Sequence, residues 1–392
     1  MINNTHRDRL SVLYVTVPSY FDLEISLLKE LNAITDLTVM MLIIPQSLKS
    51  SAFAIEKIPS KAGIYNWTEI KGLQKYAKLV PLENFKFVIA PTNAFREMHQ
   101  VKPLIKDFLK DHHFDILHGT SLSKFANYLY PVFGGIKHRI LTLHDPIPHN
   151  KLSLPRQLIN ETTIARFRNV LLLNNSLTDA FLKRFHFRTP KLFYSRLGVY
   201  DFLKSFPCKE IPNLNTDKYL LFFGRIEEYK GVDNLIRAFK ASEAKQLGYK
   251  LVIAGRGVIH ESVEDDSIVV FNHYIQNDIL SNLIRNAYFS LATYLSATQS
   301  GVIMSSFALE TPVLVTPVGG LPDYITSSDG EQMGYICGNT SADSIKEAIN
   351  YLLNNPIQVA RFKRNIANAI APDGDLGWRK IANDIKSIYS AI

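Results

Sequence analysis

The sequence predicts an α/β protein made of two doubly wound domains, each built on a parallel sheet. Short apolar segments alternate with helical segments along all 392 residues, which is the order expected when crossover helices join parallel strands. The apolar segments are nearly continuous rather than alternating, as is typical of strands that are buried on both faces. At roughly 150 residues per domain, the length corresponds to two domains.

In the first half of the chain, seven apolar segments have the length of strands, and helical segments separate them. Leucine and isoleucine dominate one side of the helix expected over Phe21–Leu31. The helix expected over Lys102–His112 carries an apolar stripe at helical spacing, with Lys102, Lys106 and Lys110 opposite. The expected strands are Leu10–Val17, Leu37–Ile44, Phe87–Ala90, Asp115–His118, Ile140–His144, Val170–Asn174 and Leu192–Arg196.

The second half repeats this alternation. A helix is expected from Gly231, because Val232, Leu235, Ile236 and Phe239 recur at helical spacing. Another helix is expected over Trp378–Ile392, after the turn-like Pro372–Asp375. The expected strands are Tyr219–Phe223, Lys250–Ala254, Ile268–Phe271, Phe289–Tyr294, Val313–Thr316 and Gly334–Cys337. The least periodic stretch, Gly198–Thr216, is the expected linker. Ligands of such folds bind beyond the carboxyl ends of the strands, so the loops that follow the strands and the cleft between the domains are the expected site.

Composition excludes several classes of protein. Apolar residues make up 46% and charged residues 20% of the chain, far from the signature of disorder. The two cysteines, Cys208 and Cys337, are too few for a disulfide scaffold and fit a reducing cytoplasm. No apolar segment reaches the roughly 18 residues that a membrane-spanning helix needs, and the polar start, Met1–Arg9, is unlike a signal peptide. We therefore expect a cytoplasmic protein.

The net charge is +8, and it is concentrated in the first half of the chain. Residues 1–200 carry 26 Lys and Arg against 15 Asp and Glu, which gives +11, whereas residues 201–392 carry 18 against 21, which gives −3. The excess indicates either solvated basic faces or a surface that meets phosphate, nucleic acid or an anionic membrane. The candidate anionic surface consists of Arg166, Arg168, Lys183, Arg184, Arg188, Lys191 and Arg196.

Two loops have the composition of anion-binding sites. In the first, Gly224, Arg225, Lys230 and Gly231 follow a strand and precede a helix, where a phosphate would meet basic side chains and a helix N-terminus. An exposed basic pair without a ligand is the alternative. In the second, Thr298, Gln299 and Ser300 precede a helix that begins near Gly301. Free backbone N–H groups at that position bind anions, although Ser300 as a plain helix cap is the alternative.

Together these segments resemble the glycosyltransferases of family 4, which have the GT-B fold of two Rossmann-like domains facing across a cleft. Gly224-Arg225 with Lys230-Gly231 is similar to the family's phosphate motif, and Val252–Gly257 is similar to the strand and glycine turn that follow it. Further matches are His273–Ala287 near the nucleobase, Pro312-Val313, Gly319-Gly320, Asp115–His118 and Thr142–Asp145.

The resemblance implies a metal-independent, retaining glycosyltransferase of the hexosyl or a related type that needs no cofactor. It would take a nucleotide-diphosphate sugar and a glycan or lipid-linked glycan acceptor, in the synthesis of cell-surface polysaccharide or glycolipid. The implied domains are 1–200 on the acceptor side, with helix 377–392 packed back on it, and 213–372 for the nucleotide sugar. The implied catalytic residues are Arg225, Lys230, His118 and Asp145; the donor-binding residues are Gly224, Gly255, Tyr274, Thr298, Gln299, Ser300, Gly301 and Ser305; the acceptor-side residues are Ser19, Tyr20, Thr120 and His144.

The sequence departs from the family pattern at several positions. Ala297 and Ser305 stand where the family commonly has two glutamates, so Thr298–Ser300 indicates a variant donor loop. Thr120 stands at the position of a second histidine, and the glycine-rich first loop is replaced by Val17–Asp22. These departures leave open a catalytically silent relative that binds a nucleotide sugar or scaffolds partner enzymes. Many relatives act at the inner face of the plasma membrane, where a basic first domain would attach peripherally.

Other constellations indicate no separate chemistry. Asp373-Gly374-Asp375 is formally a metal motif, but it lies beside Pro372 near the end of the chain, and we interpret it as a turn. The histidines His112, His113, His144 and His149 lack the spacing of a zinc site. A basic pI of about 9.2 favours nucleic acid as a rival partner, but no nucleic-acid module is recognisable, so we expect none.

Overall fold

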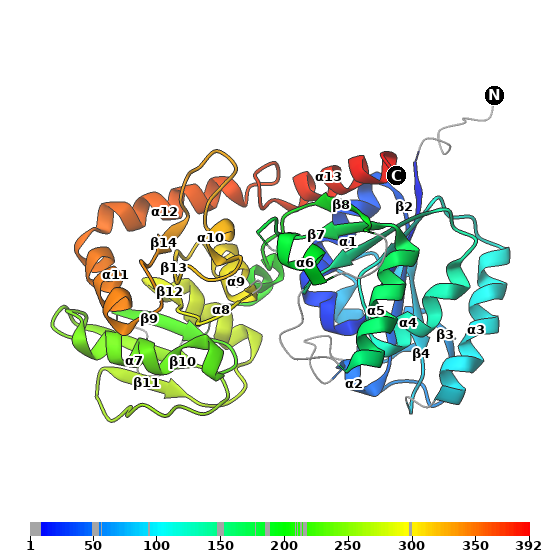
Figure 1. Ribbon diagram of the computed structural model, residues 1–392. Helices are drawn as coiled ribbons and strands as arrows, with labels where there is room; N and C mark the ends of the chain where they lie inside the picture. The colour runs from blue at the N-terminus through cyan, green and yellow to red at the C-terminus, as the bar shows by residue number, and fades with distance from the viewer. Residues whose placement is uncertain are drawn as a thin grey trace. The chain divides into compact units, whose positions relative to one another are not determined.

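The structure, a computed structural model, describes residues 9–48, 55, 57–92, 95–146, 153–176, 178–184, 189–207, 209, 211, 214, 218–297 and 300–392. The chain divides into two compact units. Unit 1 consists of the residues up to Arg196 together with Trp378–Ile392, and unit 2 is Leu197–Gly377. Each unit contains one sheet with helices packed on it (Figure 1).

Unit 1 contains a sheet in the order β3-β4-β2-β1-β5-β6-β7-β8. Its strands are β1 (Ser11–Thr16), β2 (Asp36–Ile43), β3 (Gly63–Tyr65), β4 (Phe85–Ile89), β5 (Ile116–Gly119), β6 (His138–Leu143), β7 (Asn169–Leu172) and β8 (Lys191–Tyr194). All neighbouring strands pair in parallel except β3, which runs antiparallel to β4 at the edge. The parallel strands place their carboxyl ends at one edge of the sheet, where ligands bind in this fold class.

The helices of unit 1 cover both faces of its sheet. They are α1 (Phe21–Ile34), α2 (Pro45–Leu48), α3 (Phe95–Lys110), α4 (Lys124–Leu129), α5 (Leu154–Phe167), α6 (Thr178–Arg184) and α13 (Trp378–Ser390). The last helix of the chain, α13, packs against α1. The other face buries an apolar cluster to which α3, α4, α5 and α6 contribute. Helix α13 therefore belongs to unit 1 although it follows unit 2 in the sequence.

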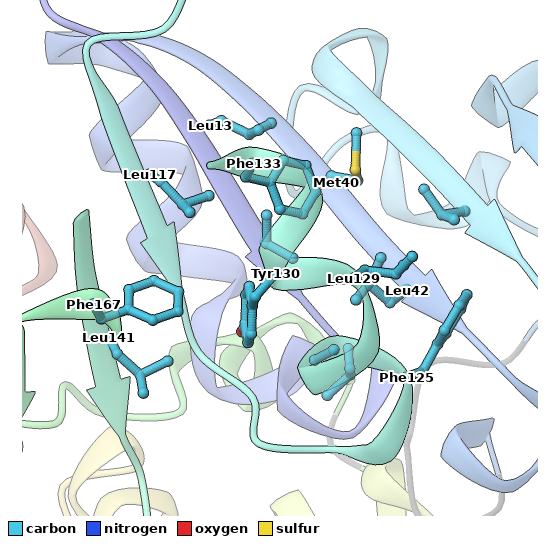
Figure 2. Close-up of a cluster of buried hydrophobic side chains, with 14 of the residues drawn as sticks. Leu13, Met40, Leu42, Leu117, Phe125, Leu129, Tyr130, Phe133, Leu141 and Phe167 are labelled. Atoms are coloured by element: carbon cyan, nitrogen blue, oxygen red, sulfur yellow. The ribbon is translucent and has the colours of Figure 1, made fainter. Parts of the chain in front are cut away.

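The apolar cluster of unit 1 fixes the end of β5 (Figure 2). Tyr130, in the short helix η5 (Tyr130–Phe133), meets Phe167 edge to face with ring centroids 4.8 Å apart. Its buried hydroxyl donates to the Ser121 carbonyl at 2.8 Å. A Cβ at Gly119 would lie 2.7 Å from this hydroxyl and 2.9 Å from Phe167, so only glycine lets the tyrosine clamp the chain just beyond the strand.

Unit 2 contains a parallel sheet in the order β11-β10-β9-β12-β13-β14. Its strands are β9 (Lys218–Phe223), β10 (Tyr249–Ala254), β11 (Ile268–Phe271), β12 (Phe289–Ala292), β13 (Val313–Val315) and β14 (Gly334–Ile336). Its helices are α7 (Val232–Ala241), α8 (Asn277–Asn286), α9 (Gly301–Ala308), α10 (Leu321–Tyr324), α11 (Ala342–Asn354) and α12 (Pro356–Ala369).

The expected elements overlap the observed ones, with three differences. Strand β3 was not predicted, because three residues at an antiparallel edge carry too little periodicity. Helix α3 begins at Phe95 rather than Lys102. The expected linker is not a free connection, because its helix η6 (Asp201–Ser205) packs on α8 and α9 within unit 2. The Ser281 hydroxyl donates to the Leu203 carbonyl at 2.9 Å there.

Candidate functional site

In unit 2, two glycine loops meet beyond the carboxyl ends of β9 and β10. Gly224 follows β9 with a φ of 111°, and its N–H donates to the Ala254 carbonyl at 3.0 Å. A Cβ at Gly255 would lie 1.7 Å from the Gly224 carbonyl oxygen. Because no side chain fits there, glycine at 255 is what allows the two loops to touch.

Lys230 is the buried cation of this site. It ends the short helix η7 (Glu228–Lys230), before Gly231 turns the chain into α7 with a φ of 66°. Only 9% of Lys230 is exposed, and burial lowers the pKa of its ammonium. Its Nζ donates to the Tyr294 hydroxyl at 3.1 Å. Among the described residues, no carboxylate pairs with it, so the charge has no counter-ion where buried charges usually have one.

Tyr294 links Lys230 to the start of α9. Its hydroxyl lies 3.1 Å from the Ser300 Oγ, and the Lys230 ammonium lies 4.6 Å from its ring centroid. Ser300 occupies the N-cap position of α9, but its side chain makes no capping hydrogen bond. The interpretation of Ser300 as a plain cap is therefore wrong, because its Oγ faces the tyrosine instead. The first N–H groups of α9 lie beside this hydroxyl, as at any helix start.

The remaining predicted donor residues lie on the same loops or outside the described residues. Arg225 has a side chain that is 76% exposed and pairs with Glu227 at 2.8 Å, so it differs from the buried Lys230. Tyr274 is 70% exposed on the loop after β11. Ser305 is buried inside α9. Thr298 and Gln299 fall outside the described residues.

Unit 1 contains a cavity of about 600 Å³ beyond the carboxyl ends of its central strands. This volume is in the range of pockets that hold small organic ligands. All four predicted acceptor-side residues and Asp145 line it, which brings together residues far apart in the sequence: Ser19, Tyr20, Thr120, His144 and Asp145. Apolar side chains of β2, β6, α4 and α6 also line the cavity, and α5 contributes polar ones.

A buried polar network lies behind the cavity wall. Glu24 of α1, 2% exposed, accepts hydrogen bonds from the Thr16 hydroxyl at 2.5 Å and from His144 Nε2, which lies 3.3 Å away. Tyr20 stacks on the His144 ring at 4.2 Å between centroids. Burial, with the nearby carboxylates Asp145 and Glu24, raises the pKa of Tyr20. The network holds the His144 ring in place at the cavity.

His118 is not placed as predicted. It is fully buried, its Nδ1 lies 2.6 Å from the Tyr389 hydroxyl of α13, and its Nε2 lies 2.6 Å from the Thr142 hydroxyl. Burial lowers its pKa to about 3. Successive side chains of a strand point to opposite faces, so Leu117 enters the cluster of Figure 2 while His118 faces α13. Neither ring nitrogen is directed to the cavity, and we withdraw the catalytic prediction.

Four polar residues at these sites have no signal of a functional role in the sequence. Tyr294 was assigned to a strand, and Glu24 to a helix. Glu161 and Arg156 of α5 line the cavity, and one buried oxygen of Glu161 and the Nε of Arg156 have no hydrogen-bond partner among the described residues. The available signal of burial was the spacing of Glu161, which stands three residues before Ile164 and so shares a face of the helix with an apolar residue.

Two further observations concern metal and membrane. Within the described residues, no group of three His, Cys, Asp or Glu side chains is arranged to hold a metal ion. Asp373–Asp375 forms a turn, as predicted, and Asp375 Oδ2 accepts the Ser328 N–H at 2.5 Å.

None of the helices in the described part of the chain is both long and apolar enough to cross a membrane.

The sequence of this chain is similar to those of known glycosyltransferases. Residues 208–369 match the family model described as glycosyl transferases group 1. An uncharacterized glycosyltransferase of Methanocaldococcus jannaschii is 27% identical over 223 residues, covering 52% of this chain and 55% of that protein. Glycogen synthase of Mycobacterium tuberculosis is 24% identical over 179 residues, covering 44% of this chain and 42% of that enzyme. The chain thus spans about half the length of the curated relatives it matches.

Solved structures match over nearly the whole chain. The Anabaena protein HepE in complex with UDP superposes with a TM-score of 0.67 at 14% identity, covering 98% of this chain and 100% of that one. Sucrose-phosphate synthase from Thermosynechococcus elongatus gives 0.65 at 13% identity, covering 97% and 98%. The chain therefore has the GT-B fold of two Rossmann-like units, and its residues 208–369 match the glycosyl transferases of group 1.

Proposed function

We propose that this protein is a retaining glycosyltransferase that moves a sugar from a nucleotide-diphosphate sugar to a hydroxyl of a glycan acceptor. The observation that carries the proposal is the buried Lys230 ammonium, which lacks a carboxylate partner among the described residues. The ammonium lies beside the glycine loop after β9, since a Cβ at Gly224 would lie 3.4 Å from its Nζ. A diphosphate supplies the missing negative charge, and HepE, of the same fold, is a protein solved with UDP.

In the proposed reaction, the bond from the anomeric carbon to the phosphate oxygen breaks, and its electron pair leaves with the nucleoside diphosphate. The acceptor oxygen bonds to the same carbon on the same face. Its proton passes to an oxygen of the departing diphosphate, so no external base is required. Lys230 and Arg225 stabilise the charge that grows on the diphosphate, which is usually the largest contribution to catalysis.

We propose further that the diphosphate is neutralised without a metal ion. Lys230, Arg225 and the N-terminus of α9 supply positive charge from the protein itself. The loop after β9 carries two adjacent glutamates, Glu227 and Glu228, but Glu227 pairs with Arg225 at 2.8 Å, so a cation of the protein already neutralises that carboxylate. Turnover is therefore expected to persist in EDTA, and a loss that Mn²⁺ restores would contradict this part of the proposal.

The acceptor is proposed to bind in the cavity of unit 1. The cavity combines apolar side chains with Glu161 and Arg156, whose carboxylate and guanidinium match a ligand that both donates and accepts hydrogen bonds. A sugar hydroxyl does both, and an apolar aglycone or lipid fits the rest. Octyl glucoside is therefore expected to be a better acceptor than free glucose, and Glu161→Gln should weaken its use while Glu83→Gln, an exposed control, does not.

The test of the proposed function is the release of nucleoside diphosphate from a panel of UDP-, GDP- and ADP-sugars, with and without acceptor. Acceptor-dependent release from one of them, with retention of anomeric configuration in the product, supports the proposal. Binding of a nucleotide sugar without any turnover would favour the silent relative, which the absence of glutamate at 297 and 305 motivates. Failure to bind any of them would overturn both.

A further inference from the structure

We propose that Lys230, Tyr294 and Ser300 form a one-way hydrogen-bond relay that presents the Ser300 hydroxyl hydrogen to an anionic oxygen of the nucleotide diphosphate, with Tyr294 as the positioning residue. The inference rests on the proposed function, because the relay needs an anion at the start of α9. It assigns a role to a tyrosine that the sequence predicts only as the end of a strand, and it removes Ser300 from helix capping.

The ammonium fixes the direction of the first hydrogen bond. A lysine ammonium has three donors and no acceptor, so in the 3.1 Å contact between Nζ and the Tyr294 hydroxyl the tyrosine oxygen accepts. The contact joins a buried cation to a buried phenol, since 9% of Lys230 and 2% of Tyr294 are exposed. A charge-assisted hydrogen bond of this kind polarises the O–H that it reaches.

The tyrosine passes the direction on to Ser300. Burial raises the pKa of Tyr294 to about 12, so the phenol keeps its proton at neutral pH, and a buried O–H needs an acceptor. The Ser300 Oγ, at 3.1 Å, is the acceptor that the described residues provide. If Ser300 donated to Tyr294 instead, the phenol hydrogen would have no acceptor among them.

The serine hydrogen is then left for a ligand. Ser300 makes no capping bond to α9, and the described residues offer its hydroxyl hydrogen no acceptor. Ser300 stands where the N–H groups of the first turn of α9 are also directed toward an anion. The two hydrogen bonds of the relay therefore orient the Ser300 hydroxyl as a second donor to the diphosphate, in addition to the Lys230 ammonium.

The experiment measures UDP, GDP and ADP binding by calorimetry to the 392-residue chain and to three variants. Tyr294→Phe keeps the ring but removes the hydroxyl, Ser300→Ala removes the last donor, and the third variant combines them. Each single change should weaken the tightest of the three nucleotides about tenfold, as expected for one charge-assisted hydrogen bond. The double variant should lose little more than either single one, because both break the same relay.

Tyr219→Phe is the matched control. The buried Tyr219 of β9 also makes one hydrogen bond, to the Leu283 carbonyl at 2.8 Å, so this variant loses a comparable contact in the same unit and should leave nucleotide binding unchanged. Thermal unfolding of all variants shows that they fold. If Tyr294 had only a structural role, Tyr294→Phe and Tyr219→Phe would both lower the unfolding temperature, and Tyr294→Phe would not selectively weaken nucleotide binding.

A pH series supplies a second readout. The ionisable groups that act on Lys230 are Tyr229, Arg225 and Glu227, in addition to Tyr294. Removing the Tyr294 acceptor destabilises the charged ammonium, so the alkaline limit of nucleotide binding should move to lower pH in Tyr294→Phe. Suppose that the wild-type protein binds UDP, GDP or ADP. The relay alone would be overturned if Tyr294→Phe bound that nucleotide with unchanged affinity, or if the losses of affinity in the double variant were additive. Wild-type protein that binds none of these nucleotides would overturn the proposed function as well.

Discussion

Lys230 and Arg225 have similar places in the sequence but different environments in the structure. Because both lie in the same loop after a strand, the sequence predicts exposed side chains whose substitution changes stability little. That expectation holds for Arg225, whose side chain is 76% exposed, and is wrong for Lys230, of which 9% is exposed. The reason is that Gly231 turns the chain inward at the end of η7, so that the ammonium reaches Tyr294.

This difference predicts that substitution of Lys230 changes stability and that substitution of Arg225 does not. Lys230→Met should lower turnover by about 10²–10³, the effect of losing one donor to the transition state. It should also raise the unfolding temperature, because it removes a desolvated charge that has no carboxylate partner among the described residues. Arg225→Ala should lower turnover similarly while stability stays within about 0.5 kcal/mol. The measurements are turnover and thermal unfolding, with the exposed Lys245→Met and Arg237→Ala as controls. A destabilised Lys230→Met would contradict the interpretation.

His118 predicts a dependence of stability on pH. Its pKa is about 3 in the folded protein and about 6.5 in an unfolded chain, so between these values only the unfolded state takes up the proton. The stabilisation is complete above pH 6.5 and is lost as the pH falls, by about 1.4 kcal/mol per pH unit. Denaturant unfolding of His118→Gln from pH 7 to 5 should show a shallower loss than wild type or the exposed His138→Gln. Equal slopes would show that His118 does not carry the effect.

At the scale of elements, the loops after β9 and β10 act as one unit. The strand ends pair through Phe223 and Ala254, and Gly224 and Gly255 continue the contact beyond the sheet. This close approach of two backbones requires glycine at 255, whereas the sequence shows only that a glycine follows a strand. The loop that carries Arg225 and η7 is therefore positioned by the neighbouring strand as well as by its own.

Gly255→Ala tests this coupling. The added Cβ would lie 1.7 Å from the Gly224 carbonyl oxygen, so the loops must separate, at a cost of about 1–3 kcal/mol in stability. Nucleotide binding should weaken more than tenfold because the loop before Lys230 moves. Gly135→Ala, where a Cβ meets nothing within 4 Å, is the control. Unchanged nucleotide affinity in Gly255→Ala would show that the contact between the two loops is not needed for nucleotide binding.

At the scale of the whole molecule, the charge is divided between the halves of the chain. Residues 1–200 carry +11 and residues 201–392 carry −3. Lys106, Arg166 and Lys183 are exposed on α3, α5 and α6, whereas the charge of Lys110 is shared with Asp107 at 2.8 Å. Arg188 lies outside the described residues. We propose that unit 1 attaches reversibly to the anionic cytoplasmic face of a membrane through these groups.

Vesicle sedimentation tests the attachment. Each Lys or Arg near an anionic leaflet contributes about 1 kcal/mol, and the attraction is screened within roughly 8 Å at physiological salt. The protein should sediment with phosphatidylserine vesicles at low salt and be released at high salt. Changing Lys106, Arg166 and Lys183 together to Gln should weaken binding, whereas changing Lys363 and Arg364 of α12 should not. If vesicle binding did not depend on lipid charge, the excess basic residues of unit 1 would be solvated surface groups and not a membrane-binding surface.

The sequence by itself determined the number, order and kind of most elements, because apolar periodicity is local. Loops that follow strand ends also located Gly224, Lys230 and Ser300. The family resemblance, not a local pattern, pointed to Tyr20 and His144, which line the cavity. The tertiary structure alone decided which groups are buried and which way they face. Burial depends on contacts between segments far apart in sequence, such as Tyr389 with His118, 271 residues apart, or Tyr294 with Lys230, 64 apart. The position of a residue along its strand does not show what packs against it in the fold. For this reason His118, predicted to be catalytic, is a core residue, and Tyr294, which was given no role, lies beside the buried Lys230 ammonium.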